Sequence, residues 1–138
     1  MNGRHTGVRS DAANLPTLTN FLQEFWSAAE LPPALAPPFE LALEEVFINV
    51  VTHGSYNGNV PWVEVSLDLA EGGVTMTVED DGPPFDPLTL PVPDVAAPLG
   101  ERRVGGLGVY LVRHMMDVVT YARVGTRNQL RMTKRLTP

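Results

Sequence analysis

Glu45 and Asn49 lie four residues apart in a segment whose apolar residues recur at helical spacing. One helical turn separates them, so both side chains share one edge of the helix, which His53 extends by another turn. A carboxylate can orient or deprotonate an attacking hydroxyl, and a neutral amide oxygen can bind Mg²⁺ without adding an anion beside phosphate. The alternative is a solvated polar edge, with His53 interacting with the carbonyl groups at the helix end.

A second acidic motif follows an apolar strand and consists of Glu79, Asp80, Asp81 and Gly82. A carboxylate at the exit of a strand can accept a hydrogen bond from an exocyclic amine such as that of adenine. Gly82 would let the backbone approach a flat ring closely. The alternative is an ordinary Asp-Gly turn.

The third motif is the run Gly105, Gly106, Leu107 and Gly108, which stands directly before a helical segment. Exposed amide groups and the positive end of a helix dipole can hold a phosphate there. A hinge is the competing explanation. The run matches neither the P-loop pattern nor a dinucleotide-binding G-x-G-x-x-G.

The composition predicts one compact domain over residues 1–138, because 43% of the residues are hydrophobic and 19% are charged. No apolar run approaches the ~18 residues of a membrane span, and no signal peptide is visible, so we expect a cytoplasmic protein without membrane contact. The absence of cysteine excludes disulfides and Cys-based zinc sites. A net charge of −6 argues against direct nucleic-acid binding.

The elements that must position the three motifs follow from apolar periodicity and turn residues. We predict helices over about 12–30, 38–54 and 106–116, with four prolines in residues 31–38 forming a stiff connection between the first two. Strands are predicted over 60–69, 74–78, 118–124 and 128–136, and a further strand could open the chain at 5–10. A long proline-rich loop separates the second motif from the third.

Taken together and in this order, the motifs resemble those of the GHKL ATPases. The segment ELALEEVFINVVTHGS (40–55) resembles their N box, VEDDGPPFDP (78–87) their G1 box, and GGLGVYLVRHMMDVVTY (105–121) their G2 box. The FDP and LVRHMMD segments are similar to the anti-sigma-factor serine/threonine protein kinase branch. The resemblance covers about residues 38–136. It implies an α+β two-layer sandwich, the GHKL (Bergerat) ATP-binding fold, with a mixed, mostly antiparallel sheet and the helices on one face.

The resemblance also implies the ligands and the site. Asn49 would bind Mg²⁺, Glu45 would be the general base, Asp80 would bind the adenine amino group, and residues 88–104 would form a lid. Pro84 departs from many relatives, which have a second glycine there. Arg102 and Arg103 would reach the terminal phosphate, unless they are a solvated basic pair. The residues implied to surround ATP are Asn49, His53, Asp80, Gly82, Phe85, Arg102, Arg103, Gly105, Gly106, Leu107, Gly108 and Thr133.

By the same resemblance, the chain would transfer the γ-phosphoryl group of ATP to a serine or threonine of an anti-anti-sigma STAS-domain protein. It would also sequester a sigma factor and form a homodimer. A second hypothesis is a regulatory switch, in which ATP sets partner affinity without efficient phosphotransfer. A third is the ATP-binding domain of a sensor histidine kinase, which is disfavoured because no dimerisation helix pair with a phospho-accepting histidine precedes the motifs.

Overall fold

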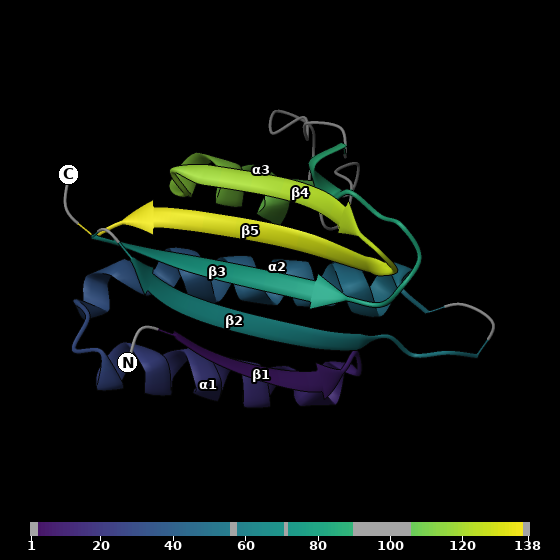
Figure 1. Cartoon of the computed structure of the whole chain (residues 1–138), viewed down its shortest axis with the longest axis horizontal. Coiled ribbons are helices and arrows are strands. Elements are labelled where there is room, and N and C mark those ends of the chain that lie inside the picture. The colour runs from purple at the N-terminus through teal and green to yellow at the C-terminus, as the bar shows by residue number, and fades with distance from the viewer. Residues whose placement is uncertain (1–2, 56–57, 71, 90–105, 137–138) are drawn as a thin grey trace, which may run out of the picture.

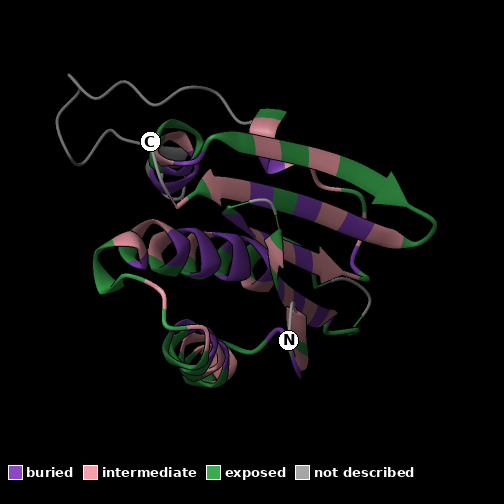
Figure 2. Ribbon diagram, turned by 60° about the vertical axis from the view of Figure 1, so that its left-hand side comes forward, coloured by how far each residue is buried: buried purple, intermediate pink, exposed green. Residues whose placement is uncertain are grey.

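The computed structural model describes residues 3–55, 58–70, 72–89 and 106–136, which form two layers (Figure 1). One layer is a five-stranded sheet in the order β1-β2-β3-β5-β4. The strands are β1 (Gly3–Arg9), β2 (Trp62–Ala70), β3 (Gly73–Asp80), β4 (Val118–Val124) and β5 (Arg127–Arg135). The other layer consists of helices that all cover the same face of the sheet (Figures 1 and 2). The predicted α+β two-layer sandwich is therefore confirmed.

The sheet differs from the prediction in one respect, since it is not mixed. All four pairings between the described strands are antiparallel. The reason lies in the order of the strands after β3, where α3 of the helical layer comes before β4 in the chain. Because β4 takes the edge and β5 folds back between β4 and β3, no parallel neighbours result.

Three helices form the second layer: α1 (Leu15–Ala28), α2 (Pro37–His53) and α3 (Gly106–Met115). The apolar stripe of α1 is buried at Leu18, Leu22, Phe25 and Trp26, as the spacing predicts. The helix begins at Leu15 rather than near residue 12, because residues 12–14 form a 3-10 turn capped by the Asp11 carboxylate. Among the described residues, no helix is both long enough and apolar enough to span a membrane.

The core between the layers fixes α2 against the middle of the sheet. Phe39 and Phe47 of α2 are fully buried, as are Val65 of β2, Met76 of β3 and Met132 of β5. Burying one large apolar side chain contributes about 1.5–3 kcal/mol. This packing sets the position of the C-terminal half of α2 relative to the end of β3, where two of the three motifs lie.

Candidate functional site

Asp80 is the last residue of β3, and its side chain lies on the face of the sheet that the helices cover. One carboxylate oxygen, Oδ1, accepts hydrogen bonds from the Gly82 amide at 2.9 Å and from Asn128 Nδ2 at 3.0 Å. No described residue donates a hydrogen bond to the other oxygen, Oδ2. Two hydrogen bonds thus fix Oδ1 of the Asp80 carboxylate, while Oδ2 can accept a hydrogen bond from a ligand.

Burial raises the pKa of the Asp80 carboxyl above its ordinary value, and the neighbouring Asp81 adds to this shift. The hydrogen bonds from Asn128 and Gly82 and the charge of Arg123 act in the opposite direction without cancelling it. The ionised form is therefore less favourable in the fold than in water. A donor from a ligand would relieve this cost.

Gly82 supports Asp80 through its own backbone. A Cβ atom at this position would lie 2.9 Å from Asp80 Oδ1 and 3.2 Å from Pro61 Cγ. Its carbonyl accepts a hydrogen bond of 2.8 Å from Arg123 in β4. Any larger residue would push the turn away from Asp80, which explains in structural terms why a glycine is needed at position 82. The sequence alone did not specify this reason.

Asn128, at the start of β5, was not among the predicted site residues and is the best-connected side chain in this region. Its Nδ2 donates to Asp80 Oδ1 at 3.0 Å and to the Pro83 carbonyl at 2.8 Å. Its Oδ1 accepts from the Phe85 amide at 3.1 Å and from the Tyr121 hydroxyl. The side chain is 5% exposed and its full hydrogen-bonding capacity is used.

Asn49, in α2, faces Asp80 and Asn128 across the same cleft. It is 5% exposed, and its Nδ2 has no hydrogen-bond partner. Asn49, Asp80, Phe85, Tyr121 and Asn128 all line one narrow cleft of about 20 Å³, about the room that one water molecule needs. A purine ring is larger than this, so a base bound at Asp80 would extend beyond the cleft or displace its walls.

One wall of the cleft is built by Phe85, whose backbone amide is held by Asn128. The His53 ring packs against the Phe85 ring, with 4.9 Å between the ring centroids. His53 itself is exposed. His53 therefore adjoins the Phe85 wall from the exposed end of α2.

Glu45 lies one helical turn before Asn49 and contacts the start of α3. A Cβ atom at Gly108 would lie 1.9 Å from Glu45 Cδ, so the absence of a side chain there leaves the space that the carboxylate occupies. Partial burial, followed by the charge of Glu44, raises the pKa of Glu45. The glycine of the third motif and the acid of the first are thus in direct contact.

The structure brings most of the predicted residues to one end of the molecule. Asn49, His53, Asp80, Gly82 and Phe85 surround or adjoin the cleft, and Glu45 with Gly108 continues the same side of α2. The predicted residues Arg102, Arg103 and Gly105 lie outside the described residues, as does the lid from residue 90 onward. Gly106 and Leu107 open α3, but their side chains are not described.

Thr133 is not brought to the cleft. It pairs with Thr75 in the sheet, and the two hydroxyl oxygens lie 2.9 Å apart. Since Asn128 is the residue opposite Asp80, Thr133 lies five residues farther along β5, about 17 Å away. Its side chain also points to the face without helices, because Leu130 and Met132 point to the core. This placement does not support a direct contact with the base.

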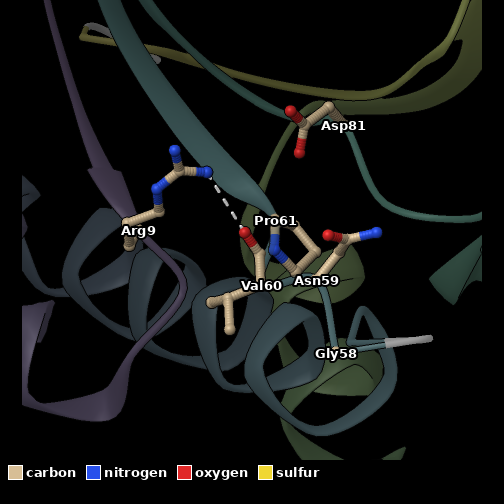
Figure 3. A pocket seen from close by; sticks show the side chains of 6 residues that line it. All are labelled: Arg9, Gly58, Asn59, Val60, Pro61 and Asp81. Atoms are coloured by element: carbon tan, nitrogen blue, oxygen red, sulfur yellow. Dashed lines mark hydrogen bonds between the residues drawn. The ribbon is translucent and has the colours of Figure 1, made fainter.

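Asp81, the neighbour of Asp80, faces a different hollow (Figure 3). This hollow of about 430 Å³ is lined by Arg9, Gly58, Asn59, Val60, Pro61 and Asp81. Asp81 Oδ1 accepts a hydrogen bond from the Trp62 amide at 2.8 Å, and Arg9 donates to the Val60 carbonyl at 3.3 Å. Its two charged residues, Arg9 and Asp81, are exposed and already hydrogen-bonded to backbone groups. We therefore treat this hollow as separate from the cleft around Asp80.

Similarity to known proteins identifies the family of this chain. Residues 8–134 match the family described as the histidine kinase-like ATPase domain. The chain belongs to this family. It is 28% identical over 117 residues to the serine/threonine-protein kinase BtrW of Bordetella bronchiseptica. The aligned residues cover 85% of this chain and 79% of BtrW.

Two solved structures share the fold of this histidine kinase-like ATPase domain. The RsbU and RsbW domains of Rv1364c from Mycobacterium tuberculosis match with a TM-score of 0.67 and 14% identity over 98% of this chain. The present chain spans 32% of that longer chain. The histidine kinase AdeS of Acinetobacter baumannii matches with a TM-score of 0.53 and 14% identity, over 98% of this chain and 70% of the other. At this identity the likeness concerns the fold alone.

Two polar groups in the cleft are available to a ligand. Asp80 offers a free acceptor and Asn49 an amide without a partner. Within the described parts of the chain, no cluster of three His, Asp or Glu side chains could hold a metal ion. Mg²⁺ in nucleotide sites takes most of its ligands from phosphates and water, and a rotated amide can present its oxygen instead of its nitrogen. The unpaired atom of Asn49 is its nitrogen, so this residue would fit a metal that arrives with the nucleotide only with its amide reversed.

Proposed function

We propose that this chain is an ATP-dependent anti-sigma-factor serine/threonine protein kinase. It phosphorylates a serine or threonine of an anti-anti-sigma STAS-domain protein and sequesters a sigma factor. One observation carries the proposal: Asn49 and Asp80, far apart in the sequence, converge on one cleft, with Glu45 one helical turn away against Gly108. The similarity to a protein named as a serine/threonine kinase supports the type of acceptor.

In this proposal Glu45 acts as the general base. Its carboxylate takes the proton of the acceptor hydroxyl, whose oxygen bonds to the γ-phosphorus, while the bond to the β,γ-bridging oxygen breaks and ADP leaves. The raised pKa of Glu45 suits this role, since a base with a higher pKa accepts a proton more readily.

Asp80 and Asn49 bind the two ends of the nucleotide. The free oxygen of Asp80 accepts a hydrogen bond from the adenine amino group, and Asn49 would hold Mg²⁺ through its amide oxygen. The metal would neutralise phosphate charge. The start of α3 offers backbone amides at a helix N-terminus to the phosphates, because Gly106 opens a helix of ten residues.

The proposed partners are a STAS-domain protein, a sigma factor and a second copy of this chain as a homodimer, all in the cytoplasm. These proposals rest on the resemblance of the motifs and on the similarity to BtrW. Incubation with γ-labelled ATP, Mg²⁺ and a cognate STAS-domain protein tests the central activity. Label on a serine or threonine of the partner supports the kinase; label that never leaves ATP in the presence of a correctly folded partner rejects it.

The rate of phosphotransfer should fall at acid pH as Glu45 becomes protonated. The pKa of Glu45 is raised by burial and by Glu44, so the acid limb of the rate should lie above the pH at which an ordinary glutamate titrates. Glu44→Gln removes the repulsive charge and should move this limb to lower pH. A pH–rate profile of both proteins under single-turnover conditions measures this. An identical acid limb in the two proteins would contradict the assignment of Glu45.

Replacing Asn49 with leucine should separate metal binding from folding. The amide is buried and its nitrogen is unpaired, so an apolar side chain of similar size should stabilise the fold by about 1 kcal/mol. The same change removes the proposed metal ligand, and Mg²⁺ should then no longer strengthen ATP binding. Urea unfolding and ATP titrations with and without Mg²⁺ measure the two effects. Retained Mg²⁺ dependence would show that the metal ligand lies elsewhere.

The narrowness of the cleft favours a second candidate function. A purine is larger than the cleft of about 20 Å³, so in this proposal ATP binding displaces the Phe85 wall and changes the shape of this surface. The chain would then be an ATP-dependent regulatory switch whose partner affinity follows nucleotide occupancy. ATP-dependent partner binding without label transfer to the partner would distinguish this function from the kinase.

A further inference from the structure

We propose that Asn128 is the positioning residue of the base cleft and that it determines how strongly the site prefers a 6-amino purine over a 6-keto purine. The inference deepens the proposed function, because it rests on ATP binding at Asp80. It concerns a residue that contacts the base-binding carboxylate and acts through it.

The first support is that the two carboxylate oxygens of Asp80 differ in their hydrogen bonds. Asn128 Nδ2 and the Gly82 amide both donate to Oδ1, at 3.0 Å and 2.9 Å. Asn128 belongs to β5 and Gly82 to the bend after β3, so the two donors approach from different segments and fix the plane of the carboxylate. With Oδ1 occupied, Oδ2 is the oxygen that remains to accept a hydrogen bond from a base. An exocyclic amine can donate to it, whereas a keto oxygen would meet it as a second acceptor.

The second support is that Asn128 cannot itself rotate. Each of its four hydrogen-bonding positions is used, by Asp80, the Pro83 carbonyl, the Phe85 amide and the Tyr121 hydroxyl. Reversing the amide would place its nitrogen against the Phe85 amide and its oxygen against the Pro83 carbonyl. Both contacts would be repulsive, so the backbone of residues 83–85 dictates that the nitrogen faces Asp80.

The third support is burial. Asn128 is 5% exposed and Asp80 is only partly exposed, so water does not readily replace a lost partner of either group. Loss of the Asn128 donor should leave Asp80 free to turn and should raise the pKa of its carboxyl further, since this hydrogen bond acts to lower it. Both effects weaken a fixed, ionised acceptor.

The test compares Asn128→Ala with Gln129→Ala. Gln129 is the next residue of β5, does not line the cleft, and donates one hydrogen bond from its Nε2 to Glu79 Oε1 at 3.0 Å. In the nucleotide-free protein, the Asp80 carboxyl is titrated by carbon NMR. Asn128→Ala should raise the pKa of Asp80 above the wild-type value, and Gln129→Ala should not. Asn128→Ser is measured in parallel, because it is smaller but keeps a donor, and it should lie between wild type and Asn128→Ala.

The same proteins are then titrated with ATP and with ITP, which differ at position 6 of the purine. Asn128→Ala should bind ATP about tenfold more weakly and ITP nearly unchanged, so the preference should fall about tenfold, while Gln129→Ala keeps it. An unchanged Asp80 pKa and an unchanged preference in folded Asn128→Ala and Asn128→Ser overturn the inference, as does an equal loss in Gln129→Ala. If wild type binds neither nucleotide, the proposed function fails, and the NMR titration still decides whether Asn128 positions Asp80.

Discussion

Asp80→Asn is expected to weaken ATP binding by about a hundredfold, or ~2.7 kcal/mol, the upper part of the range for a hydrogen bond to a charged group. Asparagine keeps an Oδ1 atom that can accept from Gly82 and Asn128 as before. At the free position it replaces an acceptor with an NH₂ group, which meets the adenine amine as a second donor. The substitution therefore removes one hydrogen bond to the adenine amine and brings two donor groups against each other.

The same change should leave the fold at least as stable at neutral pH. Burial raises the pKa of Asp80 in the folded state. The stability that this carboxyl contributes is then fully present below its unfolded pKa and is lost as pH rises through its folded pKa. Asparagine does not titrate, so Asp80→Asn should equal or exceed wild type at pH 7. Urea unfolding at acid and neutral pH measures this difference.

Asp81→Asn is the matched control, because Asp81 is the adjacent carboxylate but faces the other hollow (Figure 3). It should bind ATP within about threefold of wild type, as expected for a substitution away from the ligand. Calorimetric titration of all three proteins gives the affinities. Equal losses in Asp80→Asn and Asp81→Asn would mean that general negative charge, and not a specific acceptor, determines binding.

Glu45→Gln should reduce the rate of phosphotransfer by about a hundredfold to ten-thousandfold, the usual contribution of a general base. Glutamine has nearly the same shape and can occupy the space beside Gly108, so the packing of α2 on α3 should persist. ATP affinity should change little, because the proposed contacts of Glu45 are with the acceptor hydroxyl. Single-turnover transfer to the STAS-domain partner separates the two quantities.

Glu44→Gln is the control for Glu45→Gln, since Glu44 is the exposed neighbour on the same helix. It should keep the transfer rate at neutral pH and alter only the acid limb described above. A Glu45→Gln protein that transfers phosphate as fast as wild type would remove Glu45 from the mechanism. ATP binding at Asp80 would then favour the switch function.

The sequence predicted the elements well because their patterns are local. The stripe of α1 and the alternation in β2 and β3 depend on side chains a few residues apart. The start of α1 was predicted too early, because Asp11 caps a 3-10 turn instead of the helix. The antiparallel place of β5 between β3 and β4 depends on contacts across the whole chain, and no local pattern encodes it.

The site was predicted unevenly for a similar reason. Asn49 and Asp80 belong to motifs with fixed spacing, whereas Asn128 appeared only as the first residue of a closing strand. One signal was present: Asn128 is in phase with Leu130 and Met132, so a polar side chain had to enter the core face. The same phase places Thr133 on the opposite face. The hydrogen bonds of Asn128 to residues 83–85 depend on the bend after Gly82, which residue types do not specify.

The most direct measurement is a structure of this chain with a non-hydrolysable ATP analogue and Mg²⁺. We predict the adenine amino group within about 3 Å of Asp80 and the metal about 2.1 Å from the amide oxygen of Asn49, with the phosphates at the start of α3. The Phe85 wall should have moved outward to admit the purine. A nucleotide bound elsewhere, or a cleft that stays closed at saturating ATP, would contradict the account.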